Sequence, residues 1–407
     1  MPSALSHLRV LDLSRVLAGP WSSQILADLG AEVIKVERPG SGDDTRDWGP
    51  PFLKDKNGND THEAAYYLSA NRAKKSLTLD ISRPEGQAII LQLAAVSDIV
   101  IENFKVDGLK HYGLDYASLK PINPRLIYCS ITGFGQSGPY AHYAGYDIMI
   151  QGMGGLMSVT GERDDKPGGG PMKVGVAVTD IMTGMYATVA ILAAVEHRHQ
   201  SGEGQYIDLA LLDTQVAMLA NLTANYLVAG KVPQRLGNAH ATIVPYQPFE
   251  CADGHLILAV GNDSQFAKFC NIANATEIKN DVRFATNSAR VTHRELLIPL
   301  LQTIMKQRTR DAWLGALEPA GVPCGPINNL QQVFDNAQVK HRNVRVEVPH
   351  PLAGPLPTVA NPINFSATPI EYKKAPPLLG QHTEEILHTL LNMRDDEIQA
   401  LRNNKII

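Results

Sequence analysis

The chain carries an isolated carboxylate, Asp180, where two different sequence patterns meet. The segment KVGVAVT before it is short and valine-rich, as in a buried strand, whereas DIMTGMYATVAILAAVEHRH has apolar residues at helical spacing. We therefore expect Asp180 at or beside a helix N-terminus, where free N–H groups and the helix dipole should keep it ionised at neutral pH. Such an aspartate is by default an N-cap, but an ionised carboxylate can also act as a nucleophile.

Strand-like and helix-like segments alternate in the part of the chain that precedes this aspartate. Two β-α-β units are predicted, the first from LRVLDLS, WSSQILADLG and AEVIKVE, and the second from KSLTLDI, RPEGQAIILQLAAVS and DIVIENF. This alternation predicts an α/β fold with an open, Rossmann-like parallel sheet that helices cover on both faces.

The composition changes after about residue 226, where PYQPFECADGHLILAVG predicts a hairpin in a more mixed unit. We assign residues 1–200 to a large α/β domain, 201–225 to a linker helix and 226–329 to a small α+β domain. Residues 330–407 contain proline-rich stretches such as EVPHPLAGPLPTVANPINF and end in a helical pattern. Prolines at this density predict an extended strap laid over another surface.

The first β-α-β unit invites comparison with dinucleotide-binding folds, which hold their ligands beyond the strand ends. Its turn, SRVLAGP, lacks the GxGxxG pattern that cradles a pyrophosphate. Glu37 ends the next strand and Arg38 follows it, and an arginine suits a phosphorylated ribose or an adenine ring. Coenzyme A (CoA) carries both groups. Two interpretations therefore stay open, a nucleotide-containing ligand and plain sheet scaffolding.

Other motifs are absent or have ordinary explanations. The cations of NRAKKSLTLD would by default form a solvated face, and ENF (Glu102–Phe104) could be a turn as well as a ligand contact. The 13 histidines show no metal-binding spacing, so no metal site is predicted. No GxSxG elbow of a serine hydrolase is present.

Charge and patterning also limit the protein's class. A net charge of −4 argues against a general nucleic-acid binder. The four cysteines are scattered, as in a reducing compartment. No apolar run reaches roughly 18 residues without a charge or a breaker, so no membrane span is predicted. The start MPSALSHLRVLDLS enters a strand almost at once and leaves no room for a targeting peptide. We expect a soluble, cytoplasmic protein.

Ordered blocks along nearly the whole chain carry a specific resemblance. RVLAGP, GAEVIKVERPGSGDDTR, NRAKKSLTLD, ENF, YCSITGFGQSGP, GVAVTDIMTGMYA, GVPCGPINN and PPLLGQHT are similar to the family III CoA-transferases, the formyl-CoA transferase and carnitine CoA-transferase group. Two segments, GNAHATIVPYQPF and RVLAGP, resemble most the succinate–hydroxymethylglutarate (glutarate) branch. The resemblance implies transfer of CoA from an acyl-CoA donor such as succinyl-CoA to an acid acceptor, expected to be a dicarboxylate. No metal is implied.

The resemblance gives each matching position a role. Asp180 stands at the catalytic aspartate, which reacts through an aspartyl anhydride and an aspartyl-CoA thioester. The positions that match CoA-binding segments are Leu17, Ala18, Arg38, Leu79, Asp80, Ile81, Ser82, Asn103, Phe104, Lys105, His111, Tyr143, Ala144, Gly145 and Tyr146. For the acceptor's distal carboxylate we expect Arg15, Asn238 and His240, and we expect backbone N–H groups near Gly261 to serve as oxyanion donors.

Departures from the pattern narrow the substrate. Formyl-CoA transferases have Gln in place of Leu17 and Lys in place of Ala144, and VGNDSQF stands where their active-site glycines lie. These changes argue against an oxalate or formate substrate, although formyl-CoA:oxalate-type and carnitine-type transfer remain alternatives within the family. From other classes, a nicotinamide-dependent dehydrogenase and a non-catalytic acyl-CoA-binding protein also remain. The resemblance further implies an interlocked homodimer in which residues 330–407 complete the large domain.

Overall fold

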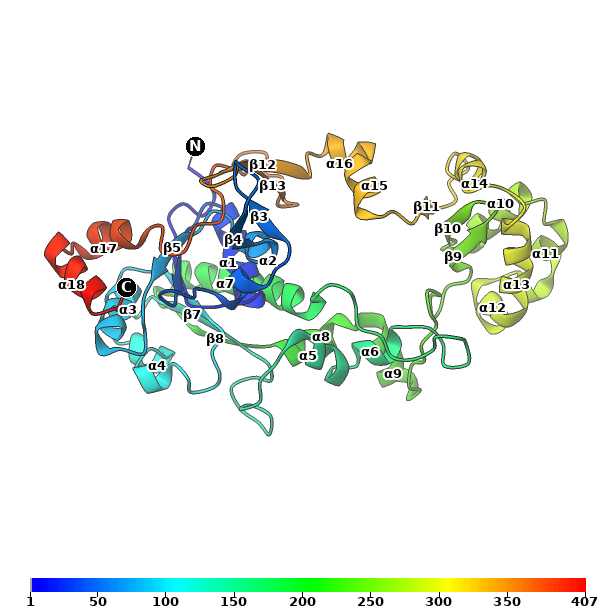
Figure 1. Cartoon of the computed structure of the whole chain (residues 1–407). Coiled ribbons are helices and arrows are strands. Elements are labelled where there is room, and N and C mark those ends of the chain that lie inside the picture. The colour runs from blue at the N-terminus through cyan, green and yellow to red at the C-terminus, as the bar shows by residue number, and fades with distance from the viewer. Residues whose placement is uncertain (1) are drawn as a thin grey trace. The chain divides into compact units, whose positions relative to one another are not determined.

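The computed structural model of the protein describes residues 2–407, which divide into two units. The first unit combines residues up to 156 with 174–227 and 338–407. The second combines residues 157–173 and 228–337. The chain therefore leaves the first unit twice and returns to it twice (Figure 1).

A six-stranded parallel sheet forms the centre of the first unit (Figure 1). In spatial order its strands are β5 (Lys75–Thr78), β2 (Glu32–Glu37), β1 (Arg9–Asp12), β6 (Ile99–Glu102), β7 (Ile127–Thr132) and β8 (Tyr206–Ala210). Counted along the chain, this order is that of a Rossmann fold, with the direction of winding reversing between β1 and β6. The predicted α/β fold with a parallel sheet is confirmed.

Helices cover both faces of this sheet, because its strands are apolar on both sides. On one face, Val10, Val33 and Ile127 pack with α1 (Ala18–Asp28) and α7 (Val178–Ser201). On the other face, Leu11, Ile34 and Leu77 pack with α3 (Pro84–Ala95), α17 (Thr383–Leu391) and α18 (Asp395–Asn403). Segments from both ends of the sequence thus build one core.

The edge strand β5 is covered by residues that lie about 300 positions later in the sequence. The Ser76 amide donates to His382 Nδ1 (3.2 Å) and the His382 amide donates to Ser76 O (3.0 Å). Just beyond the strand, the Asp80 amide donates to the carbonyl of Ile406 (2.7 Å), whose side chain is fully buried. These bonds occupy backbone groups that would otherwise be exposed at the sheet edge.

Helix α7 is the longest helix and crosses α1 closely. A Cβ atom added at Gly184 would lie 2.6 Å from Ala18 O, so only glycine allows this approach. With a mean hydropathy of 1.6 over its best window, α7 is long and apolar enough to cross a membrane. Its buried side is the side that packs on the sheet, and the central helix of a globular core has the same composition.

The cations of NRAKKSLTLD do not form a solvated face, so that prediction is wrong. Arg72 pairs with Asp28 (2.6 Å) and Lys74 with Asp12 (3.2 Å), and all four side chains are buried. Lys74 also donates to Asn71 Oδ1 and Pro20 O. Local sequence could not reveal this, because both acidic partners come from the first β-α-β unit.

The second unit has its own core around a three-stranded antiparallel sheet, which confirms the predicted hairpin. Its strands, in spatial order, are β11 (Cys324–Pro326), β10 (Gly254–Ala259) and β9 (Tyr246–Cys251). Phe249, Phe269 and Trp313 are buried at its centre. The helices around them are α10 (Asp263–Ile272), α11 (Thr276–Asn280), α12 (Asn287–Thr292), α13 (Arg294–Met305), α14 (Arg310–Leu317) and the 3₁₀ turn η3 (Val282–Phe284), followed along the chain by α15 (Leu330–Asp335).

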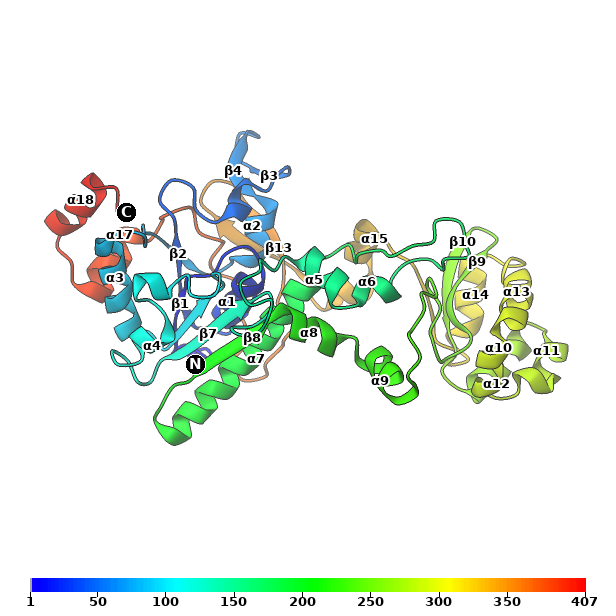
Figure 2. The same ribbon diagram turned by 90° about the horizontal axis from the view of Figure 1, so that it is seen from below.

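The first unit also contains shorter elements outside the central sheet. They are η1 (Asp44–Asp47), β3 (Phe52–Lys54), β4 (Asp60–Ala64), α2 (Ala65–Ala70), η2 (Lys110–Tyr112), α4 (Tyr116–Leu119), α5 (Asp147–Met153), α8 (Leu211–Met218), β12 (Arg345–His350) and β13 (Gly354–Val359). Three short helices, α6 (Leu156–Val159), α9 (Ala220–Ala229) and α16 (Ala337–His341), span the points in the sequence where the chain passes between units. Figure 2 shows α5 and α8 beside the start of α7.

Candidate active site

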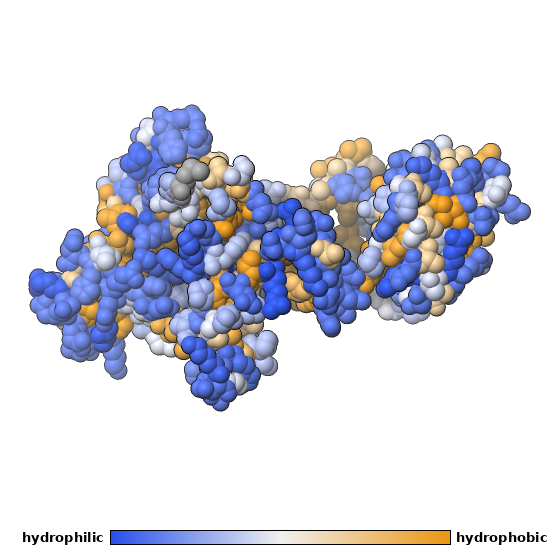
Figure 3. Space-filling view, turned by 90° about the horizontal axis from the view of Figure 1, so that it is seen from above, coloured by the Kyte–Doolittle hydropathy of each residue, from blue (hydrophilic) through white to orange (hydrophobic). Residues whose placement is uncertain are grey.

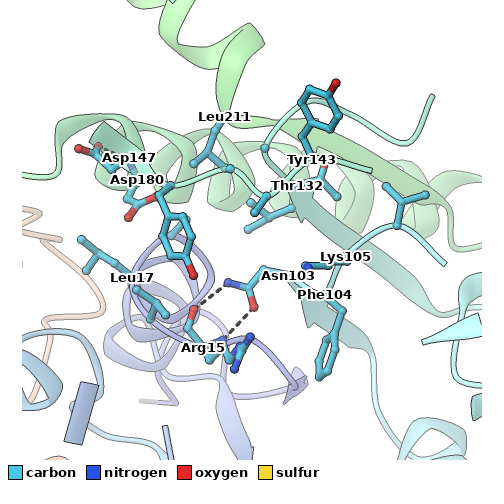
Figure 4. Close-up of a pocket in the computed structure, with 18 of the residues that line it drawn as sticks. Arg15, Leu17, Asn103, Phe104, Lys105, Thr132, Tyr143, Asp147, Asp180 and Leu211 are labelled. Carbon is cyan, nitrogen blue, oxygen red and sulfur yellow. Dashed lines mark hydrogen bonds between the residues drawn. The ribbon is translucent and has the colours of Figure 1, made fainter. Parts of the chain in front are cut away.

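The turns after β1 and β6 meet where the winding of the sheet reverses, the usual ligand site of such sheets. The Arg15 amide donates to Asn103 Oδ1 (3.0 Å), and Asn103 Nδ2 donates to Arg15 O (2.7 Å), as Figure 4 shows. This reciprocal pair joins two turns that sequence analysis assigned to a ligand site separately. The Asn103 side chain therefore fixes the two turns relative to one another.

The turn after β1 holds a strained residue. Val16 has a φ of 70°, a left-handed conformation that β-branched residues rarely adopt. Its amide donates to the carboxylate of Asp43 (3.2 Å to Oδ2), which also forms a buried ion pair with Lys35 (2.8 Å). Burial alone would favour the neutral acid, but Lys35 and the amide and hydroxyl of Thr45 lower the pKa of Asp43 to about 2. A fixed charge behind the turn thus maintains its strain.

Asp180 lies in the first turn of α7, but it is not the N-cap of that helix. The N-cap position is Ala177, whose side chain makes no capping bond. Asp147 of α5 supplies the acceptor instead, because its Oδ1 receives the amides of Thr179 (2.9 Å) and Asp180 (3.3 Å). Among residues 2–407, no side chain forms a hydrogen bond or ion pair with the Asp180 carboxylate. The default prediction of a capping role is wrong.

The expectation that the helix N-terminus keeps Asp180 ionised at neutral pH is not confirmed. Burial, and secondly the neighbouring Asp147 carboxylate, raise the pKa of Asp180 to about 7. Figure 4 shows the two carboxylates next to one another. Among residues 2–407, no cation lies close enough to oppose this effect, and the amides of Thr179 and Asp180 donate to Asp147 instead. A carboxyl group poised near neutrality is typical of functional sites.

A small polar network holds Asp147 in place. Gln151 Nε2 donates to Asp147 Oδ2 (2.6 Å), and Gln151 Oε1 accepts the Val174 amide (2.9 Å). Thr179 Oγ1 donates to Gln215 Oε1 (2.6 Å) of α8. Sequence analysis missed Asp147 and Gln151, although their i,i+4 spacing in YDIMIQG would have placed both on one helical face.

A cavity of about 440 Å³ brings Asp180 together with most of the predicted residues. The predicted residues that line it are Arg15, Leu17, Ala18, Asn103, Phe104, Lys105, Tyr143, Ala144, Gly145, Tyr146 and Asp180. Trp48, Thr132, Asp147 and Leu211 also line it and were not predicted. Gly145 is pressed against Gly133, because a Cβ atom added there would lie 2.2 Å from the Gly133 Cα. That contact seats the Tyr143–Tyr146 loop on the end of β7.

A second cavity of about 460 Å³ adjoins the first and contains the other predicted group. The predicted residues that line it are Arg15, Arg38, Leu79, Asp80, Ile81, Ser82 and Phe104. Asp80 Oδ1 accepts the amide (3.0 Å) and hydroxyl (2.6 Å) of Ser82, which shapes the turn after β5. The two cavities share Arg15, Asp44 and Phe104.

Four predicted residues are not brought to these cavities. His111 lies in η2 and lines neither of them. Asn238, His240 and Gly261 belong to the second unit, where Asn238 lines a separate cavity of about 350 Å³. None of these three lines the cavity around Asp180, so acceptor binding by Asn238 and His240 and oxyanion binding near Gly261 stay predictions.

Glu102 is a further buried carboxyl group at the site, only 5% exposed, and sequence analysis gave it no role. It ends β6, and its Oε2 accepts the amide of Phe104 (2.8 Å). Burial raises the pKa of Glu102 to about 7, although Ser130 and the Phe104 amide oppose the shift by hydrogen bonding. Glu102 thus holds the Asn103–Lys105 turn through its bond to the Phe104 amide.

The model of CoA-transferase family III matches residues 5–383 of the chain. The chain belongs to this family. A succinate–glutarate CoA-transferase from Agrobacterium fabrum is 53% identical over 387 residues, which are 95% of each chain. The human succinyl-CoA:glutarate CoA-transferase is 43% identical over 403 residues, covering 99% of this chain and 90% of the human protein.

Solved structures agree with this assignment. The crystal structure of a CAIB/BAIF family protein from Brucella suis has a TM-score of 0.84 and 48% identity, and the match covers 96% of this chain and all of that one. The protein is therefore a CoA-transferase, as the resemblance implied. The dehydrogenase and the non-catalytic binding protein are no longer alternatives.

Proposed function

We propose that this CoA-transferase moves CoA from succinyl-CoA to a dicarboxylate such as glutarate, with Asp180 as the covalent nucleophile. The observation that carries the proposal is the Asp180 carboxylate itself. It is partly buried in a cavity lined by the CoA-binding segments of the family, yet it forms no hydrogen bond or ion pair within residues 2–407. The substrates named for the relatives from Agrobacterium fabrum and human support this choice of donor and acceptor.

The reaction would proceed in four steps that return Asp180 unchanged. A carboxylate oxygen of Asp180 attacks the thioester carbonyl of succinyl-CoA, and the C–S bond breaks to give a mixed anhydride and the CoA thiolate. The thiolate attacks the aspartyl carbonyl and releases succinate, which leaves an aspartyl-CoA thioester. The acceptor carboxylate attacks this thioester and frees the thiolate again. The thiolate then takes the acceptor's acyl group and restores Asp180.

Two properties of the site would favour these steps, the binding of CoA close to Asp180 and the raised pKa of Asp180. CoA held through its nucleotide keeps the freed thiolate at high effective concentration beside the anhydride. Only the ionised form of Asp180 can attack, so its raised pKa ties the first step to pH. A basic carboxylate is also the better nucleophile, which compensates for the smaller ionised fraction.

The protomer exposes apolar side chains on the helices beside the site. Met149 and Met153 of α5 and Met185, Tyr186 and Val189 of α7 are each at least 40% exposed. Figure 3, which views the protein from the side opposite to Figure 2, shows further apolar residues at the surface among polar ones. We propose that a second copy of the chain covers these residues in the interlocked dimer implied by the family. Light scattering should then give twice the protomer mass, persisting on dilution to nanomolar concentration. A folded and active monomer at that dilution would contradict interlocking.

A substrate panel tests the proposed reaction. The protein is incubated with succinyl-CoA and equal concentrations of acetate, formate, oxalate, glutarate and other dicarboxylates, and new thioesters are identified by mass. We expect glutaryl-CoA or a related dicarboxylate thioester, together with a hydroxylamine-sensitive adduct on the peptide that contains Asp180. Equal transfer to acetate and glutarate would argue against a dicarboxylate acceptor, and oxalyl-CoA as main product would favour the formyl-CoA:oxalate-type alternative.

A further inference from the structure

The rim shared by the two cavities contains a cation that can move. Arg15, Asp44 and Phe104 line both cavities, and Arg15 is the one cation of the three. Its backbone is fixed, because Asn103 bonds both its amide and its carbonyl. Its side chain is 62% exposed and forms a single ion pair, from Nη1 to Asp44 Oδ2 (3.1 Å). An exposed pair of this kind is weak and exchanges readily.

CoA has a shape that matches the two cavities and their rim. It consists of a nucleotide and a pantetheine thioester arm, with a diphosphate between them. If the nucleotide occupies the cavity with Arg38 and the thioester reaches Asp180 in the other, the diphosphate must cross the shared rim. Two phosphate charges would then lie beside the Arg15 guanidinium, whose planar donors suit phosphate oxygens better than a single exposed carboxylate.

We propose that Arg15 binds the diphosphate of CoA, and that Asp44 holds the guanidinium at the rim until CoA replaces it. This inference rests on the proposed function, since it takes CoA as the ligand of both cavities. Under this proposal Arg15 binds the CoA part of the donor, and not the distal carboxylate of the acceptor as we expected from the sequence. Asp44 has a double effect: it keeps the Arg15 guanidinium at the rim, and its negative charge opposes the diphosphate.

The test compares donors that do and do not contain a diphosphate. Initial rates are measured with succinyl-CoA, succinyl-dephospho-CoA and S-succinylpantetheine, for the native protein and for Arg15→Ala, Arg15→Lys and Asp44→Asn. Arg402→Ala is the matched control, because Arg402 also forms an exposed pair, with Glu384, and lines neither cavity. Titration of CoA into each protein gives a readout of binding that does not depend on turnover.

We expect Arg15→Ala to raise the KM for both nucleotide donors by about tenfold or more, the effect of losing a charge-assisted hydrogen bond. The preference for succinyl-CoA over S-succinylpantetheine in kcat/KM should fall by the same factor, while the KM for the acceptor stays the same. Arg15→Lys should retain part of the binding. Asp44→Asn should tighten CoA by a few-fold, and salt should weaken CoA binding less in Arg15→Ala than in the native protein.

Two results would overturn the inference while the proposed function survives. One is a raised KM for the dicarboxylate in Arg15→Ala with unchanged CoA binding, which would show that Arg15 binds the acceptor. The other is an equal loss with S-succinylpantetheine, which would show a general disturbance of the turn. If the native protein bound no CoA and transferred none, the proposed function itself would fail.

Discussion

Two groups of charged residues lie within the same unit, and they differ in whether each charge has a partner of opposite sign. Behind the turn after β1, Asp12, Lys35, Asp43 and Lys74 are buried, and every carboxylate has a cation and hydroxyl partners. At the start of α7, the Asp180 carboxylate is partly buried beside another carboxylate and has neither. Pairing lowers the pKa of Asp12 and Asp43, whereas isolation raises that of Asp180. The paired charges hold the site in shape, and the unpaired charge is left available for chemistry.

The largest expected effect comes from removing the unpaired charge. Asp180→Asn should abolish CoA transfer, a loss of at least about 10³-fold, while CoA still binds. The side chain forms no bond within residues 2–407, so the variant should fold normally, as circular dichroism and thermal melting would show. More than a few per cent of native activity in Asp180→Asn or Asp180→Ala would end the covalent hypothesis.

Removing a paired charge should instead lower the free energy of unfolding, which Asp180→Asn is not expected to lower. Lys35→Met leaves Asp43 buried without its cation, and we expect a loss of about 3–5 kcal/mol in the free energy of unfolding, measured with urea. Activity should fall at least as far as the folded fraction, because the same pair holds the turn that carries Leu17. Lys54→Met is the control, because Lys54 and Asp60 form an exposed pair that should contribute about 0–1 kcal/mol. Equal stability of the two variants would show that the buried pair does not hold the turn.

The third prediction concerns the pH at which Asp180 ionises. In the free enzyme, kcat/KM should fall below about pH 7 as Asp180 becomes protonated. Asp147→Asn removes the neighbouring negative charge but keeps an oxygen acceptor for the helix amides. It should therefore lower the pKa of Asp180 and extend activity to lower pH. An unchanged acidic limb in Asp147→Asn would mean that another group controls it.

The raised pKa also has a consequence for stability with a definite sign. The folded protein binds the Asp180 proton more tightly than the unfolded chain does, so this group stabilises the fold most below pH 3.8, its ordinary pKa. That contribution disappears as the pH rises through about 7. Relative to the native protein, Asp180→Asn should consequently gain stability between pH 4 and 8. A relative loss over this range would contradict the pKa shift.

The smallest effect is expected at Glu102, which is buried without a cation but bonded to the Phe104 amide. Glu102→Gln keeps an acceptor for that amide and should change the KM for succinyl-CoA less than twofold. Glu102→Ala removes the acceptor and should raise this KM by several-fold with little change in kcat, since it moves the Asn103–Lys105 turn. A similar KM in both variants would show that the bond does not position the turn.

The same comparison explains what could be predicted from the sequence. The parallel sheet and the turns with Leu17, Arg38 and Asn103 follow from local patterns, because each strand and its following turn are contiguous. The cations of NRAKKSLTLD were assigned to a solvated face because Asp12 and Asp28 are far from them in the sequence. Asp147 was not predicted for the same reason, since it lies on a separate helix, α5, from which it accepts the first amides of α7. A local pattern does not show which distant partner neutralises a charge.

The bond between Asp80 and Ile406 has a consequence for how the protein is made. Asp80 lines the second cavity, and its amide donates to a residue synthesised long after the sheet's strands. A ribosome-bound chain that has already emerged through β8 would still expose the edge of β5, where unpaired backbone groups can recruit other strands. Contacts of such long range also form slowly. The growing chain should therefore be most prone to wrong strand pairing during the interval before Ile406 reaches the edge of the sheet.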